Sequence, residues 1–279
     1  MASDAPQPPV PDLRRLFRPQ PHRFEFGIRP GAEDWFRLPD PPPPELGHRR
    51  ELLAAAPERH APWLPEAEPV FDGLVGWFSD PDVRALTGGG AAAARTLGGL
   101  WPPDYVLLGR DPSGNHRMVG GCVCDPSWWD PQATLGRPVA AIHEVVPGLN
   151  AQLGDRIRTF LDRLPADTVV TRENWGLAAV PDRNLHPTLG RPRLGPDATP
   201  ETTWLRVEHQ AFRALPDLGG MVFLIWLTVH PLTDVLRDPV AAGGLALQLE
   251  TLPDPVAAYK GVAAARSNLA HRLRHAAEG

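Results

Sequence analysis

A long apolar segment in the last third of the chain places the strongest constraint on the fold. Residues 222–230 read Val-Phe-Leu-Ile-Trp-Leu-Thr-Val-His, which is apolar on both faces when extended. Such a strand needs cover on both faces, so residues 220–230 are predicted to form a central, buried strand of a sheet. The longest apolar run, residues 221–229, is only about half as long as a bilayer-crossing helix, so no membrane segment is expected.

Four other segments are predicted to be strands. Residues 105–108 and 117–124 are rich in β-forming residues, and the turn-forming sequence Asp-Pro-Ser-Gly-Asn at 111–115 separates them. This pattern predicts a hairpin. Residues 168–171 and 204–210 have the composition of further strands.

Helices are predicted between and after these strands. Apolar residues at helical spacing, with Asn150 and Asp254 as N-caps of the second and last segments, predict helices over residues 45–56, 150–164, 232–247 and 255–275. Strands that follow one another through turns, with helices inserted between them, indicate an antiparallel sheet covered mainly on one face. We therefore expect an α+β fold.

Proline content indicates how the chain is organised. Residues 1–22 contain six prolines and few apolar anchors, which predicts an extended, disordered tail. Residues 23–279 are expected to form a single domain. Its first segment is predicted to be a docked strap that aromatic and aliphatic residues pin to the core, namely Phe24, Phe26, Ile28 and Trp35.

Charge and cysteine content exclude several classes of protein. The net charge of −5 and the pI near 6.1 argue against a nucleic-acid partner, which normally requires a basic surface. Two cysteines, spaced i and i+2, provide no disulfide framework. The N-terminus lacks a basic segment followed by an apolar one, so we expect a cytoplasmic protein. Arginine supplies all but one of the 28 basic residues, the exception being Lys260.

His143 is the candidate metal ligand. It lies in the mostly apolar stretch Ala-Ala-Ile-His-Glu-Val-Val-Pro-Gly at 140–148. Neutral imidazole is the commonest metal ligand, and a haem needs one axial nitrogen inside an apolar pocket. The alternative is a buried histidine that bonds a backbone carbonyl. His186 and His209 present the same alternatives.

The predicted strand at 204–210 carries a second candidate group. Side chains alternate along a strand, so Trp204, Arg206, Glu208 and Gln210 share one face. On a solvent-exposed face they would be ordinary polar residues. In a cavity, the guanidinium and the carboxylate would become desolvated groups that polarise a ligand and move protons.

Several motifs in order resemble one known family. They are Gly-Gly-Cys-Val-Cys-Asp-Pro-Ser-Trp (120–128), Gly-Arg-Pro-Val-Ala-Ala-Ile-His (136–143) with Val-Pro-Gly (146–148), Arg-Glu-Asn-Trp (172–175), Leu-Arg-Val-Glu-His-Gln (205–210) with Leu-Pro (215–216), and Tyr-Lys (259–260). Together they resemble the catalytic α-subunit of the haem-dependent oxidative N-demethylase family. The likeness spans roughly residues 24–262.

The resemblance implies a fold, a cofactor and a reaction. It implies a PAS-like antiparallel sheet covered by helices, which encloses a pocket for haem b. It also implies the oxidation of an amine by O2, by N-dealkylation or N-oxygenation. Because no flavin, nicotinamide or iron–sulfur motif is visible, electrons are expected from a separate redox partner protein.

The resemblance also assigns roles to individual residues. His143 would be the proximal haem ligand, with Arg172, Asn174 and Trp175 as further haem-binding residues. Arg206 would stabilise negative charge developing on oxygen, and Glu208 would hold a cationic amine and accept its proton. From the residues alone, Arg172 could instead pair with a surface acid.

Departures from the family pattern leave the substrate open. The segment 128–136 lacks a lysine before its glycine, Glu144 and Val145 replace a more usual Ala-Pro, and Trp226 replaces a basic residue. A small dimethylamine-like substrate and a larger biosynthetic amine are both compatible with the motifs. The rival hypothesis is a PAS-type haem sensor of diatomic gases, which would use the same pocket without turnover.

Overall fold

A computed structural model describes residues 9–278. The strands are β1 (Arg29–Pro30), β2 (Asp104–Arg110), β3 (His116–Cys122), β4 (Val169–Ala178), β5 (Trp204–Leu215) and β6 (Gly220–Pro231). The helices before β4 are α1 (Leu13–Leu16), α2 (Glu45–Ala55), α3 (Pro57–His60), α4 (Ala67–Gly76), α5 (Pro81–Arg84), α6 (Gly90–Leu100), α7 (Pro131–Thr134), α8 (Val139–His143) and α9 (Leu149–Arg163). Those after β6 are α10 (Thr233–Leu236), α11 (Pro239–Thr251), α12 (Asp254–Tyr259) and α13 (Arg266–Glu278).

The sheet is antiparallel throughout, in the order β1-β4-β5-β6-β2-β3. Strand β6 lies between β5 and β2, and most of it is buried, which confirms the central strand predicted at 220–230. The predicted hairpin is formed by β2 and β3. Strands and helices together make an α+β fold, as expected.

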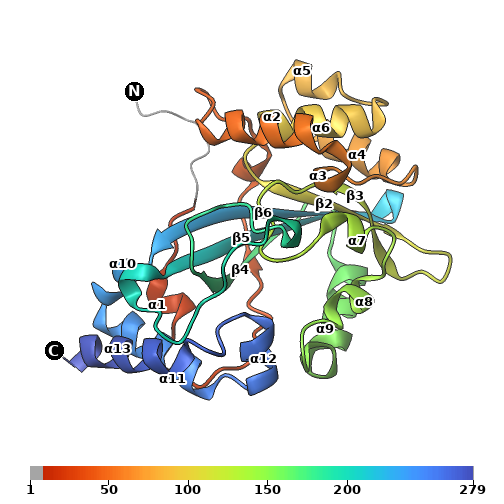
Figure 1. The fold of residues 1–279 in the computed structure, drawn as a ribbon. Coiled ribbons are helices and arrows are strands. Elements are labelled where there is room, and N and C mark those ends of the chain that lie inside the picture. The colour runs from red at the N-terminus through yellow and green to blue at the C-terminus, as the bar shows by residue number, and fades with distance from the viewer. Residues whose placement is uncertain (1–8, 279) are drawn as a thin grey trace.

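Both faces of the sheet are covered, with most of the helices on one of them. The first face includes Val207, Ala211 and Leu224 and packs against α2, α4 and α6 at one end and α11 and α13 at the other. The second face includes Phe212 and Phe223 and packs against α9 and the strap. Figure 1 shows these three groups of helices at different places around the sheet.

Two segments predicted as single helices each form two helices, because helix-starting or helix-ending residues lie within them. The segment 232–247 forms α10 and α11 because Asp238 caps a new helix whose first turn contains Pro239. The segment 255–275 forms α12 and α13, with Gly261 at φ 69° between them. That φ lies in the left-handed region, which ends a helix.

Neither predicted N-cap serves as one. Gly148, at φ 79°, precedes α9, and Asn150 lies inside the helix, where its amide donates to the Ala140 carbonyl at 2.8 Å. This bond ties α9 to α8. Asp254 is the first residue of α12, and its carboxylate pairs with Arg266.

The N-terminal segment is docked through α1 and Phe17, which departs from the disordered tail predicted for this stretch. Phe17 is fully buried and packs edge-on against Trp175, with ring centroids 5.5 Å apart. Arg15 pairs with Glu173 on β4 at 2.9 Å. One aromatic anchor and two ion pairs, Arg15 with Glu173 and Arg14 with Asp238, therefore hold a segment whose prolines indicated disorder. Residues 1–8 of the predicted tail lie outside the described residues.

The strap that follows packs against α9 and β6. Phe26 contacts Phe160 of α9 at 5.4 Å between centroids, and Trp35 contacts Trp226 of β6 at 6.0 Å. No described helix combines the length and the apolar character that spanning a membrane would require. Cys122 and Cys124 are buried free thiols.

Candidate functional site

A cavity of about 990 Å³ lies between the second face of the sheet, helices α8, α9 and α12, and the strap. Most of its lining is apolar and comes from α9 and the sheet, including Leu153, Ile157, Phe160, Phe223 and Ile225. Proteins bind small molecules and cofactors in concave, mostly apolar cavities of this size with a few polar groups. The cavity is therefore the candidate functional site.

Several polar groups of the cavity come from β4 and β5. The register pairs Arg172 with Gln210, Asn174 with Glu208, and Gly176 with Arg206. Directly paired residues lie on the same face, so the prediction that Arg206, Glu208 and Gln210 share a face holds. All of them line the cavity, so this face is not the ordinary solvated surface that was the alternative.

Glu208 is held by neutral amides. Its Oε2 accepts from Gln210 Nε2 at 2.9 Å and from Asn174 Nδ2 at 3.3 Å. Within residues 9–278, Glu208 forms no ion pair within 4.0 Å. Amide donors fix the position of a carboxylate without neutralising its charge. Glu208 can therefore still take a cation or a proton.

Arg206 lines the same cavity but directs its guanidinium to a neighbouring loop. It donates to the carbonyls of Asp182 and Arg183 at 2.6 and 2.7 Å and to Ser127 Oγ at 3.2 Å. Burial lowers the pKa of Arg206 to about 10, against the charges of Glu208 and Asp125, which raise it. These bonds anchor residues 182–183 to β5.

Arg172 has no such anchor. Its Nε is buried and has no hydrogen-bond partner among the residues that the structure describes. Burial lowers the pKa of Arg172, and the nearby carboxylate of Glu208 partly opposes that shift. The predicted alternative of a surface ion pair is not seen in residues 9–278, so this guanidinium is available to an anionic ligand.

His143 is the last residue of α8 and lines the cavity. Its Nδ1 is buried and lacks a hydrogen-bond partner in the described part of the chain. Burial, and then the charge of Arg172, lower the pKa of His143, which keeps the imidazole neutral. By contrast, His209 is held by Glu173 and Thr228. A neutral, unpartnered imidazole can bind a metal.

Asn174 and Trp175 point to opposite sides of β4. Asn174 supports Glu208 in the cavity, as described above. The side chain of Trp175 belongs to the first face and packs against Phe17. Its carbonyl oxygen accepts from Lys260 Nζ at 2.7 Å. Lys260 follows α12 and lines the cavity near Glu208 and Arg172.

Sequence reasoning missed part of the lining. Trp128, at the unusual φ of 68°, stacks against Arg193, whose Cζ lies 3.4 Å from the ring centroid. Both residues line the cavity, as do strap residues such as His22. Lys260 was visible in the sequence as the sole lysine. No local signal predicts that the loop containing Arg193 returns to this wall.

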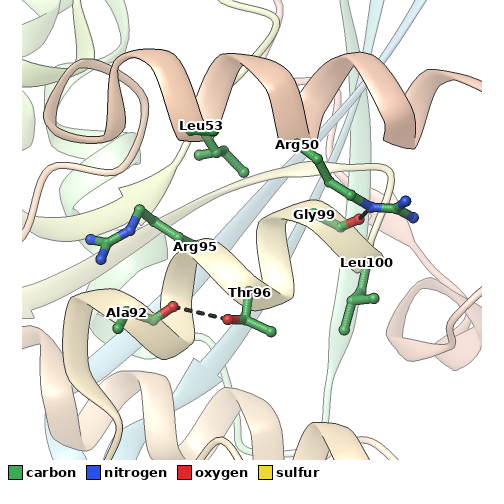
Figure 2. Close-up of a pocket in the computed structure, with 8 residues that line it drawn as sticks. Arg50, Leu53, Ala92, Arg95, Thr96, Gly99 and Leu100 are labelled. Carbon is green, nitrogen blue, oxygen red and sulfur yellow. Dashed lines mark hydrogen bonds between the residues drawn. The ribbon is translucent and has the colours of Figure 1, made fainter.

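A second, shallower pocket lies between α2 and α6, as Figure 2 shows. Its volume is about 480 Å³, and Arg50 and Arg95 are its charged residues. Arg50 Nε donates to the Gly99 carbonyl at 2.9 Å and thereby joins the two helices. This pocket contains no carboxylate or imidazole, so the cavity at β4 and β5 remains the candidate site.

Comparison with known families agrees with the motifs. A family model described as haem-dependent oxidative N-demethylase, alpha subunit-like, matches residues 81–270, which is more than half of the chain. His143, Arg172, Arg206, Glu208 and Lys260 all fall within the match. The docked N-terminal segment and helices α1–α4 fall outside it. The chain belongs to the haem-dependent oxidative N-demethylase alpha-subunit-like family.

Proposed function

We propose that this protein oxidises an amine with O2 at a haem b held in the cavity, by N-dealkylation or N-oxygenation. The observation that carries the proposal is one cavity with an unpartnered imidazole on one wall and a carboxylate held by neutral amides on another. The family match independently indicates dependence on haem.

The residues of the cavity fit a haem. A porphyrin supplies four ring nitrogens of its own, so a single imidazole completes its attachment to the protein. His143 offers that imidazole, and its unpartnered Nδ1 has no competing bond among residues 9–278. Arg172, also unpartnered at Nε, would pair with a propionate. The apolar side chains of α9 and the sheet would cover the macrocycle.

The haem, when bound, would supply the binding and activation of O2, with electrons from a separate redox partner protein. The chain's own residues would handle the amine. Glu208 would bind the ammonium form and accept its proton, because its charge is fixed in place and uncompensated by an ion pair among the described residues. Arg206 would keep the wall around Glu208 rigid through its three loop contacts.

The test is spectroscopic and kinetic. Purified protein should show a Soret band, and dimethylamine or a larger secondary amine should perturb it. Oxygen consumption with a chemical reductant should then depend on the amine. Glu208→Gln should retain the Soret band and lose amine-dependent turnover. A colourless protein that does not take up hemin would exclude the proposal, as would full turnover in Glu208→Gln.

A further inference from the structure

Lys260 is unusual in both the sequence and the cavity. All of the 27 other basic residues of the chain, counting lysine and arginine, are arginines. Where only a positive charge is needed, this chain therefore has arginine. A lysine differs from an arginine in that its amine can lose its proton when buried. Among the lysines and arginines of the chain, Lys260 is therefore the one whose side chain can release a proton in this way.

Its surroundings have two parts. The Nζ group donates to the Trp175 carbonyl at 2.7 Å and lies 4.6 Å from the centroid of the Trp175 ring. This contact caps a backbone carbonyl of β4, and an arginine could also make it. The other part is charge. Glu208 on β5 and Arg172 on β4 both act on the ammonium, and His22 and the adjacent Tyr259 are further titratable neighbours.

These neighbours compete for the proton. Burial lowers the pKa of Lys260 to about 8, the charge of Arg172 lowers it further, and the carboxylate of Glu208 opposes both. Burial, and then the charge of Lys260, lower the pKa of His22 to about 4, so His22 is neutral. Burial, and then Glu208, raise the pKa of Tyr259, so its hydroxyl stays protonated. Lys260 is thus the cation in this group that can change charge near neutral pH.

We propose that Lys260 is the proton store of the cavity and takes over the proton that Glu208 accepts from a bound ammonium. This inference rests on the proposed function and extends it by one step. A secondary ammonium gives its proton to the Glu208 carboxylate and becomes a neutral amine, and the carboxylic acid then passes the proton to neutral Lys260. Glu208 ends as a carboxylate and Lys260 as an ammonium, so protons and charge balance.

The structure shows no direct ion pair between Lys260 and Glu208 in residues 9–278, so the second transfer requires at least one bridging water. Lys260 acts through Glu208 and does not touch the amine, so it is a positioning residue. Its neutral form is required, which gives the sign of the pH effect. The ratio kcat/KM should rise as pH increases through about 8.

The sole lysine allows a direct measurement on the intact protein. With [13C]-ε-lysine labelling, the protein as purified should give one lysine resonance. A sample that contains haem is recorded in the diamagnetic ferrous carbonyl state. Its midpoint should lie near 8. Glu208→Gln should lower that midpoint by about one unit, because the carboxylate that favours the ammonium is gone. Arg237→Lys adds an exposed lysine as an internal reference, which should titrate near about 10.4.

The kinetic counterpart is Lys260→Arg, which keeps the bond to Trp175 but cannot release a proton. It should retain the melting temperature, lose the rise of kcat/KM near pH 8 and lower kcat/KM at pH 9 by about 100-fold. Lys260→Met should lose the same rise. Retention of the wild-type pH profile in Lys260→Arg would overturn the proposal and leave only the capping role.

A lysine midpoint equal to that of the exposed reference, or one that Glu208→Gln leaves unchanged, would also overturn it. The proposed function fails separately, through a missing Soret band or amine-independent oxygen consumption. If the proposed function failed while Glu208→Gln still lowered the midpoint of Lys260, the coupling between these two residues would stand without the amine chemistry.

Discussion

Two glutamates on neighbouring strands, Glu173 on β4 and Glu208 on β5, lie on opposite faces of the same sheet and have opposite environments. Glu173, with only 6% of its side chain exposed, accepts from Arg15 at 2.9 Å and pairs with Arg29 at 3.1 Å and His209 at 3.5 Å. Glu208 accepts from two amides and has no such cations against it in the described residues. The charge of Glu173 is therefore matched by cations, whereas that of Glu208 remains available to a ligand.

The same contrast separates the two cavity arginines. The guanidinium of Arg206 donates to two carbonyls and a hydroxyl, whereas Arg172 Nε is buried without a partner in residues 9–278. Natural structures pair nearly all buried polar groups, and an unpartnered one commonly marks a functional site. His22, His143 and Arg172 each line the cavity and carry such an atom.

The largest expected effect is on turnover. Glu208→Gln preserves the shape and the amide contacts but removes the charge, so amine oxidation should fall by about 100-fold or more. Melting temperature and hemin binding should stay close to wild type. Steady-state oxygen consumption with a saturating amine measures this effect. Equal rates for the two proteins would show that the cavity does not use this carboxylate.

Glu173→Gln should act on stability instead. The change leaves Arg15, Arg29 and His209 without their common acceptor, and breaking a buried ion-pair group costs about 3 kcal/mol. Urea unfolding monitored by tryptophan fluorescence gives the free energy of unfolding. An unchanged midpoint would remove the distinction between the two glutamates.

The loss of unfolding free energy at acid pH should also depend on Glu173. Burial alone would raise the pKa of Glu173, but hydrogen bonds from His209 and Arg15 and the charge of Arg29 lower it from 4.5 to about 2. The depressed value means that this contribution is complete above pH 4.5 and is lost as pH falls towards about 2. The free energy of unfolding of wild type, measured across that window, should fall more steeply than that of Glu173→Gln.

The two arginines provide a smaller contrast. Arg206→Met should lower the free energy of unfolding by about 2 kcal/mol, because it leaves the carbonyls of Asp182 and Arg183 without their donor. Arg172→Met should change stability by less than about 0.5 kcal/mol, since it removes a desolvated charge with no hydrogen bond at Nε. Arg172→Met should instead weaken hemin binding, as measured by titration. The reverse ranking of stabilities would contradict the assignment of Arg206 as an anchor.

Much of the fold could be predicted from local sequence. The two-faced apolarity of 220–230 identified the central strand, and the turn at 111–115 identified the hairpin. The docking of Phe17 could not be predicted, because a single aromatic residue in a proline-rich segment gains its burial only from the distant α11 and β4. Pro239 and Gly261 are local signals for a break in a helix. Apolar residues at helical spacing on both sides of each nevertheless predicted one continuous helix.

The site was predictable to the extent that it depends on strand alternation. That alternation alone predicts that Arg206 and Glu208 lie on one face. It could not show that loop residues 182–183 engage Arg206 or that Lys260 lines the same cavity as Glu208, since both arrangements join segments distant in sequence. The position of His143 in the cavity wall likewise depends on how α8 packs, which no local pattern specifies.

The central claim is that His143 holds a haem in the cavity that Glu208 lines, and titration of purified protein with hemin tests it most directly. Wild type should bind one equivalent and develop a Soret band, and the exposed-histidine control His48→Ala should do the same. His143→Ala should lose the band at equal hemin concentration and regain it when free imidazole is added. Undiminished binding by His143→Ala, with a spectrum identical to that of wild type, would contradict the account.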